Sequence, residues 1–235
     1  MTGKVAIITG GSQGIGAGLA AAYRAQGWAV VASAHAVMPS QDPDLLTVAA
    51  DITEPATGAL IIDVALERFG RIDTLVNSAG AFISKPFTDY TAEDYALIVG
   101  VNLTGFFWLT QRAVAEMATR YGGHVVTITV TPAEYPGSGP PAVLAALARG
   151  GLAAATRSLA VEYASYGIRV NAVSPGVIQA PVHPPERADD LGDRLPPAGR
   201  PGQVGDVVDG VLFLESSPHI TGKILHLDSG QVTGH

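Results

Sequence analysis

A glycine-rich segment near the start of the sequence has the composition of a phosphate-binding loop. Residues 9–16 read Thr-Gly-Gly-Ser-Gln-Gly-Ile-Gly and lie between an apolar run and a helical pattern. Glycines there allow a tight turn and a close approach of the backbone to a pyrophosphate, whose charge the free N–H groups of a helix N-terminus attract. A plain turn also favours glycine, so the loop alone leaves a nucleotide site and a purely structural turn both open.

The elements that would position this loop alternate between strand and helix. Apolar runs typical of strands lie at 4–8, 28–33, 45–49, 73–76, 124–130, 168–173 and 223–227. Helical patterns lie between them at 14–26, 56–69, 92–120, 143–165 and 204–215. Apolar strands that alternate with helices form a parallel sheet covered on both faces. We therefore expect an α/β fold, a doubly wound parallel sheet of about seven strands in a single domain over residues 1–235.

Composition excludes several classes of function. With 14 Lys and Arg against 21 Asp and Glu, the net charge is −7, which argues against a nucleic-acid partner. The absence of cysteine excludes disulfides, iron–sulfur clusters and thiolate zinc sites, and the histidines show no metal-binding spacing. No apolar run reaches the roughly 18 residues of a membrane span, and the N-terminus does not have the pattern of a signal peptide. We expect a cytoplasmic protein with no membrane partner and no metal site.

Further motifs follow the glycine loop in a fixed order. Asn77-Ser78-Ala79-Gly80 follows the fourth expected strand, and Asn102 lies within the long helix expected at 92–120. Residues 166–176 read Tyr-Gly-Ile-Arg-Val-Asn-Ala-Val-Ser-Pro-Gly, and residues 220–230 hold Ile-Thr-Gly-Lys and Asp-Ser-Gly. Together these motifs resemble the classical short-chain dehydrogenase/reductase family over essentially the whole chain. Acyl-carrier-protein-reductase-like and alcohol-dehydrogenase-like members are the most similar.

The resemblance implies a Rossmann-type sheet, a nicotinamide dinucleotide and a homo-oligomer, either a tetramer or a dimer. It also implies that the proline-rich segment 181–201 forms a substrate lid over a small-molecule substrate. The nucleotide contacts that it implies are Gly10, Ser12, Gln13, Gly14, Ile15, Gly16, His35, Asp51, Ile52, Asn77, Ala79, Gly80, Arg149, Pro175, Gly176 and Ile178.

The end of the second expected strand bears on which dinucleotide binds. A carboxylate there would bind the ribose diol and repel a 2′-phosphate, but Ala34 and His35 occupy this corner. This favours NADP(H) over NAD(H). The preference is weak, because Gln13 replaces the arginine that many NADP-preferring members carry and His35 is the one basic candidate. Weak binding, or no tight binding of either nucleotide, stays open.

The catalytic tyrosine and lysine of the family are not matched. Residues 149–162 fit the family pattern and run without a gap into Pro175-Gly176, which fixes the register. The family lysine then falls on Arg149, and the tyrosine four residues earlier falls on Ala145. Arginine can place positive charge and donors near a ribose, but it cannot act as a base.

The other two catalytic positions are only partly kept. The family asparagine matches Asn102, whereas the serine of the fifth strand falls on Val130, or on Thr131 after a one-residue slip. Residues 131–141 contain four prolines and therefore form a loop or a broken helix. Tyr135 and Glu134 lie in this segment, where the resemblance implies that substrate approaches.

Three functions remain compatible with this pattern. Loss of a positioned acid costs about 10²–10⁴ in rate, so we expect a family homologue with impaired or altered redox catalysis, a pseudoenzyme. One alternative is an active NADPH-dependent carbonyl or alcohol oxidoreductase, in which Thr131 or Tyr135 supplies the proton with help from Asn102. Another is a non-redox enzyme with Glu134 as base, or a scaffold or partner subunit. Strand-end and solvent-facing roles for Thr131 and Tyr135 stay open too.

Overall fold

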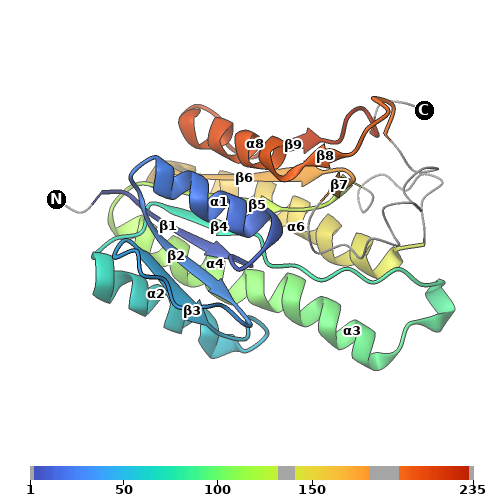
Figure 1. Ribbon diagram of the computed structural model, residues 1–235, viewed down its shortest axis with the longest axis horizontal. Helices are drawn as coiled ribbons and strands as arrows, with labels where there is room; N and C mark the ends of the chain where they lie inside the picture. Colours follow the sequence, from blue (N-terminus) through green and yellow to red (C-terminus); the bar gives the residue numbers. More distant parts are fainter. Residues whose placement is uncertain (1–2, 132–140, 180–195, 233–235) are drawn as a thin grey trace.

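The computed structural model describes residues 3–131, 141–179 and 196–232. Figure 1 shows their course, and Tyr135, Glu134 and most of the expected lid lie outside them. The strands are β1 (Val5–Thr9), β2 (Ala29–Ala34), β3 (Leu45–Ala49), β4 (Thr74–Asn77), β5 (Gly123–Ile128), β6 (Ile168–Pro175), β7 (Ile178–Gln179), β8 (Gly202–Gln203) and β9 (Ile224–Leu227). The longer helices are α1 (Gly14–Ala25), α2 (Pro55–Phe69), α3 (Ala92–Val99), α4 (Gly105–Thr119), α6 (Val143–Glu162) and α8 (Val204–Ser216). Short helical turns are η1 (Phe87–Asp89), η2 (Gly100–Thr104) and η3 (Ala164–Tyr166).

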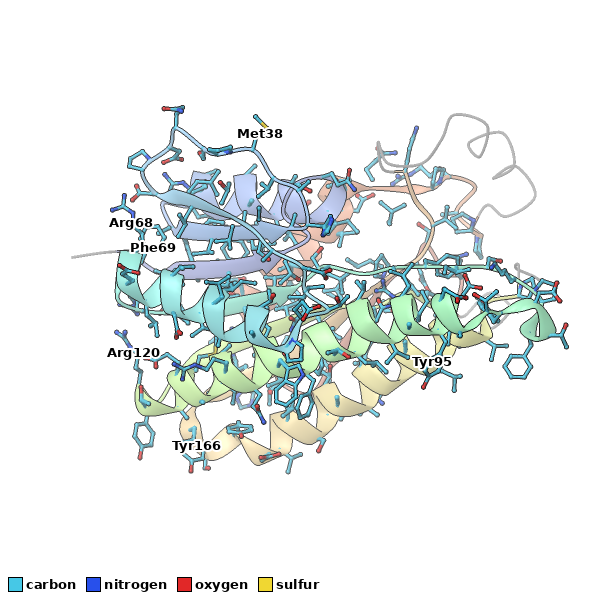
Figure 2. All side chains as sticks on the ribbon, turned by 90° about the horizontal axis from the view of Figure 1, so that it is seen from below. Met38, Arg68, Phe69, Tyr95, Arg120 and Tyr166 are labelled. Carbon is cyan, nitrogen blue, oxygen red and sulfur yellow. The ribbon has the colours of Figure 1, made fainter. Side chains whose placement is uncertain are left out.

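The main sheet has seven parallel strands in the order β3-β2-β1-β4-β5-β6-β9. Helices α2, α4 and α6 lie side by side over one face, while α1 and α8 cover the other (Figures 1 and 2). Each face packs a separate apolar core against its helices. This is the doubly wound α/β fold expected from the alternation of strands and helices, so that prediction is confirmed. Among the described residues, no helix has the length and apolarity needed to cross a membrane.

Two expected boundaries are wrong. The helix expected at 92–120 is divided by the π-helical turn η2, where the side-chain amide of Asn102 donates to the carbonyl of Ile98 at 3.0 Å. The fifth strand ends at Ile128 rather than at residue 130. Beyond it the backbone N–H of Thr129 still donates to the carbonyl of Val173 at 2.8 Å, and the hydroxyl of Thr131 donates to the carbonyl of Ser174 at 3.0 Å.

The amino end of the sheet contains a buried polar cluster centred on Glu215 of α8. Its carboxylate accepts hydrogen bonds from the hydroxyls of Tyr23 and Thr74, at 3.1 and 2.9 Å, and from Nδ1 of His124 at 3.0 Å. Arg169 lies 3.9 Å from the same carboxylate and donates to the carbonyl of Glu215 at 3.1 Å. We call these five residues the Glu215 cluster. They come from α1, β4, β5, β6 and α8, so the cluster connects the helix layer to the sheet.

Burial shifts the pKa values of this cluster. It lowers the pKa of His124, against the opposing effect of Glu215, so the ring is neutral. It raises the pKa of Tyr23 well above its usual value, and the negative charge of Glu215 adds to that shift. Burial alone would raise the pKa of Glu215, but its hydrogen bond to His124 and the charges nearby hold it below its ordinary value.

Candidate functional site

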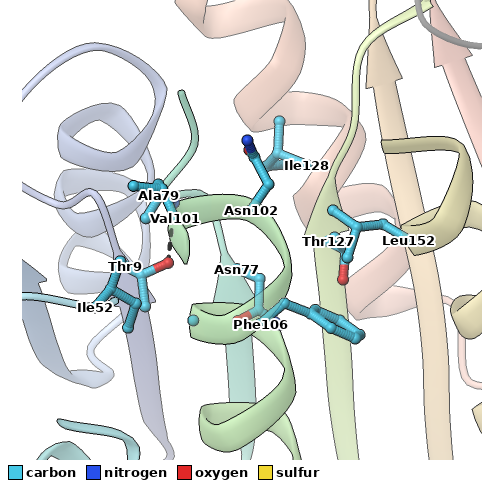
Figure 3. Close-up of a pocket in the computed structure, with 11 residues that line it drawn as sticks. Thr9, Ile52, Asn77, Ala79, Val101, Asn102, Phe106, Thr127, Ile128 and Leu152 are labelled. Carbon is cyan, nitrogen blue, oxygen red and sulfur yellow. Dashed lines mark hydrogen bonds between the residues drawn. The ribbon is translucent and has the colours of Figure 1, made fainter. Parts of the chain in front are cut away.

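The carboxyl ends of β1, β4 and β5 meet a helical turn at one edge of the sheet. A small pocket lies there, enclosed by strand ends and by η2 and the start of α4 (Figure 3). The residues that line it are Thr9, Ile52, Asn77, Ala79, Val101, Asn102, Gly105, Phe106, Thr127, Ile128 and Leu152. Open parallel sheets bind their ligands outside the carboxyl ends of the strands, so this edge is the candidate site.

The hydroxyl of Thr9 connects the ends of two strands at this edge through hydrogen bonds. Its hydroxyl oxygen accepts hydrogen bonds from the backbone N–H groups of Ser78 and Ala79, at 3.0 and 2.9 Å, the second of which is drawn in Figure 3. The segment after β4 is thereby held against the end of β1. Thr9 was not among the residues expected to form the site, although a hydroxyl residue at the end of a strand, directly before Gly10, was a usable signal.

The glycine loop has a backbone that only glycine fits. Gly10 and Gly14 have φ values of 67° and 55°, in the left-handed region that other residues rarely adopt. A methyl group on Gly16 would overlap the carbonyl oxygen of Gly10. Gln13 caps α1 without a side-chain hydrogen bond, so the first N–H groups of the helix keep their partial positive charge for an anion. This loop fits the pyrophosphate of a dinucleotide.

The neighbouring residues of the loop differ in exposure. Ser12 is exposed, whereas Ile15 is half-buried and packs against the core beneath α1. At the next strand ends, the carboxylate of Asp51 accepts from the N–H and hydroxyl of Thr53, at 2.9 and 2.8 Å. These bonds hold the pKa of Asp51 below its usual value, with a smaller contribution from His35. The carboxylate is thus ionised and is held in place by Thr53.

The loop after β6 is closed by the C-terminal segment. The N–H of Gly176 donates to the carbonyl of Leu227 at 3.0 Å, and Gln231 accepts from the N–H of Val177 at 3.3 Å. A methyl group on Gly176 would overlap the side-chain oxygen of Gln231. Pro175 ends β6, and Ile178 lies buried in β7, paired with Gly202. The part played by Gln231 was not predicted, because nothing in the local sequence couples it to this loop.

The side chain of Asn102 is engaged in hydrogen bonds with backbone groups. Its amide nitrogen donates to the carbonyls of Ala81 and Ile98, both at 3.0 Å, and its oxygen accepts from the N–H of Ala81 at 3.3 Å. The side chain is 2% exposed. It therefore joins the π-helical turn to the segment that follows β4, which positions Gly80 and Ala81 at the edge of the site.

Arg149 projects from α6 to the same place. Its residue is 7% exposed, and its Nη1 donates to the carbonyl of Ile128 at 2.8 Å. The guanidinium lies directly over Gly80, since a Cβ built there would be 3.0 Å from Cζ and would overlap Nη2. The same built Cβ would be 3.1 Å from the side-chain oxygen of Asn102. Burial lowers the pKa of Arg149 to about 10.

Comparison with known proteins identifies the family. Residues 10–231 match the family model described as enoyl-(acyl carrier protein) reductase. The chain belongs to the short-chain dehydrogenase/reductase family. It is 30% identical to the 3-oxoacyl-(acyl-carrier-protein) reductase of Thermotoga maritima, over 99% of both chains.

Solved structures of similar proteins have the same fold. The chain superposes on ElxO with NADP bound with a TM-score of 0.89 and 26% identity, covering 99% of this chain and 100% of that one. It superposes on the 3-ketoacyl-(acyl-carrier-protein) reductase of Brucella melitensis complexed with NADH with a TM-score of 0.87 and 27% identity, over 98% and 99%. The expected family and fold are both confirmed.

The positions expected to be catalytic lie in two different surroundings. Ala145 is fully buried in α6, one helical turn before Arg149. Thr131 is buried, and its hydroxyl is within 3.3 Å of the hydroxyl of Ser174 as well as bonded to its carbonyl. The structure thus brings Asn102, Arg149 and Gly80 together, while Thr131 binds β6. Within the described residues, no group of three or more acidic or histidine side chains is arranged for a metal.

Proposed function

We propose that this short-chain dehydrogenase/reductase binds a nicotinamide dinucleotide, NADP(H) in preference to NAD(H), and that its carbonyl-reducing activity is impaired or altered. The observation that carries the proposal is the pair Ala145 and Arg149 on adjacent turns of α6. In the family register they occupy the tyrosine and lysine positions. The site keeps the surroundings of the reaction but not its proton donor.

The glycine loop supports the nucleotide part of the proposal. Its constrained backbone and the unoccupied donors at the start of α1 fit a pyrophosphate, while Asp51 and Ile52 would flank the adenine. Asn77, Gly80 and the loop after Pro175 would enclose the nicotinamide end. When bound, the nicotinamide would supply or accept a hydride. ElxO, which is similar over the whole chain, is named with NADP, and the Brucella reductase is named with NADH.

The preference for NADP(H) is supported by the corner after β2. β2 ends at Ala34 and is followed by His35, so neither residue at the strand end supplies the carboxylate that would repel a 2′-phosphate. His35 follows directly and is exposed at this edge, where its imidazole would face the phosphate. The expected preference is modest because His35 is the one basic candidate at this corner.

The altered chemistry follows from what the two residues can do. An alanine methyl donates no proton, so no group at position 145 can protonate a developing alkoxide. Arg149 keeps a positive charge beside Gly80 and can stabilise negative charge there, but a guanidinium does not exchange protons as a tyrosine does. Substrate would meet a cationic site with no acid at the usual place.

A second candidate is an active oxidoreductase with a different proton donor. It is favoured by the names of similar proteins, since the Thermotoga and Brucella relatives are both reductases. Thr131 fits this role less well than expected, because its hydroxyl already donates to the carbonyl of Ser174. Tyr135 remains the other candidate donor.

The experiment is a calorimetric titration with NADPH and NADH, followed by a carbonyl panel read by NADPH oxidation. We expect micromolar binding of NADPH, weaker binding of NADH and little turnover. Gly16→Ala should abolish binding because its methyl overlaps Gly10, whereas Gly205→Ala on α8, with nothing within 4 Å, should not. No binding of either nucleotide contradicts the first part of the proposal. Robust turnover, lost in Tyr135→Phe, would establish the second candidate instead.

Assembly into a homo-oligomer is part of the same proposal. Exposed apolar side chains gather on α4 and α6, where Phe107 is 53% and Leu147 is 64% exposed. A shallow apolar groove between these helices is lined by Leu103, Phe107 and Trp108, with Gly151 on its far side. Burying these groups against a second copy would remove a large apolar surface from water. Light scattering after size exclusion should give a dimer or tetramer, and a monomer would contradict this.

A further inference from the structure

The guanidinium of Arg149 has one side in use and another without a partner. Nη1 donates to the carbonyl of Ile128, while Nε is fully buried and has no hydrogen-bond partner within the described residues. Nη2 lies against the Cα of Gly80, and only a glycine leaves room for it. Nε and Nη2 form the edge of a guanidinium that grips a carboxylate with two parallel bonds. This edge is the part of Arg149 not engaged by Ile128.

Other arginines of this chain show how that edge is normally used. Arg24 donates from Nε and Nη2 to the two oxygens of Asp42, at 2.8 and 3.1 Å. Arg71 does the same to Asp73, at 2.8 and 2.5 Å. In the part of the chain that the structure describes, no carboxylate lies within ion-pair distance of Arg149, although it is the most deeply buried of the three. A buried charge without a counter-charge is strongly unfavourable, so a negatively charged partner would be bound with a large gain.

The position of this edge points to a ligand rather than to a structural partner. Arg149 lies between the end of β5 and Gly80, where the carboxyl ends of the strands form the candidate site. A lysine at this position would present a single point charge, whereas arginine presents a planar fork that matches a carboxylate. The family lysine and Arg149 therefore differ in the shape of the anionic group that each can bind.

We propose that Arg149 is a specificity-determining residue that binds the carboxylate of a small oxo acid through its Nε–Nη2 edge. The proposal rests on the proposed function in assuming that the substrate site lies beside the nucleotide. It assigns the substrate to a chemical class, carbonyl compounds that carry a carboxylate, and it predicts discrimination against the corresponding neutral esters. A phosphate of the nucleotide presents similar oxygens, so the test separates the two sources.

The test follows the Nε–Hε resonance of Arg149 by NMR in protein labelled with ¹⁵N-arginine. Arg149→Lys identifies the resonance by its loss, and Arg157→Lys, an exposed position on the same helix, is the matched control. Pyruvate, acetoacetate and 4-oxopentanoate are titrated, each against its methyl ester, with and without NADPH. We expect at least one acid to shift the resonance to saturation while its ester does not. Arg149→Lys should weaken binding of that acid about tenfold or more, whereas Arg157→Lys should leave it unchanged.

Several results would overturn the proposal. These are equal binding of acid and ester, unchanged acid binding by Arg149→Lys, and absence of binding by any acid. Saturation of the resonance by NADPH alone, with no further response to acids, would assign the edge to the nucleotide instead. A failure of the proposed function can be told apart from a failure of this inference, because the acid would then bind while NADPH would not. If Arg149→Lys does not fold, the comparison of acid with ester in the wild-type protein still decides.

Discussion

An arginine lies at each end of the sheet, Arg169 partly buried and Arg149 buried, and the surroundings of the two side chains are opposite. At the amino end, Arg169 donates to the carbonyls of Leu214 and Glu215, at 2.7 and 3.1 Å, and lies beside the Glu215 carboxylate. At the carboxyl end, Arg149 has a single hydrogen bond to Ile128 among the described residues. Arg149 lies in the helix α6 and Arg169 in the strand β6, so both belong to regular elements.

This contrast separates two uses of buried charge. The Glu215 cluster is satisfied within the chain, so its contribution goes to stability and to the joining of α8 to the sheet. Arg149 is only partly satisfied among the described residues, which costs stability, and we propose that its unpaired edge binds a ligand. We therefore expect the amino end of the sheet to contribute stability and the carboxyl end to contribute binding. The following variants test that division.

The largest effect is expected at the amino end. Glu215→Leu removes the acceptor of Tyr23, Thr74 and His124 and leaves Arg169 without a counter-charge. Removing one partner of a buried ion pair costs about 3–5 kcal/mol of the free energy of unfolding. Urea denaturation followed by circular dichroism measures it. Glu67→Leu, on the exposed face of α2, is the control and should stay within about 0.5 kcal/mol. Equal effects of the two variants would refute a stabilising cluster.

Thr9→Val tests whether hydrogen bonds at the carboxyl end of the sheet also stabilise the fold. The substitution keeps the shape of the side chain but leaves the N–H groups of Ser78 and Ala79 without their acceptor. Loss of about 2 kcal/mol in the free energy of unfolding is expected, because unsatisfied donors keep their desolvation penalty. Thr9→Ser retains the hydroxyl and should recover most of it. If valine and serine behave alike, the two hydrogen bonds contribute nothing measurable.

Arg149→Met should act in the opposite direction to Glu215→Leu. Replacing a buried, unpaired charge with an apolar side chain of similar length should raise the free energy of unfolding by about 1–2 kcal/mol. The gain is limited because the carbonyl of Ile128 loses its donor. The same denaturation experiment measures it, with Arg149→Lys as the variant that keeps the charge. Destabilisation as large as that of Glu215→Leu would show that Arg149 is satisfied after all.

The pH dependence of the free energy of unfolding tests the part that His124 plays at the amino end of the sheet. The pKa of His124 is below its ordinary value in the folded protein, so below about pH 6.5 the unfolded chain binds a proton that the folded chain does not. The stability contributed by the neutral ring is therefore complete above pH 6.5 and is lost as the pH falls, by at most about 1.4 kcal/mol per pH unit. Urea denaturation between pH 7.5 and about 5.5 should show this slope. His124→Gln should flatten it, and an unchanged slope would assign the effect to other groups.

The fold and the glycine loop could be predicted because both are local in the sequence. Apolar runs mark each strand of the sheet, and the spacing of Gly10, Gly14 and Gly16 marks a tight turn before α1. The break of the helix at η2 was not predictable in this way. It depends on Asn102 reaching Ala81, which is 21 residues away, and no periodicity records such a contact.

The bonding of the candidate site could not be predicted from the sequence. The family register supplied Arg149, Gly80 and Asn102 as separate candidates, and the structure shows that these three lie together. What the sequence left open is which donors of Arg149 are used, since that depends on the backbone of Ile128. The Glu215 cluster was missed altogether, because Tyr23 and Glu215 are 192 residues apart and each looks ordinary in its own segment.

The position of Glu215 in the chain has a consequence for synthesis. Each partner of its carboxylate in the described part of the chain precedes it, and it lies in α8, which is followed by β9 and the segment that closes on Gly176. While the ribosome is still making α8, a nascent chain would hold His124 and Arg169 with no acid to pair with them. The Glu215 cluster at the amino end of the sheet is therefore completed only after α8 has been made.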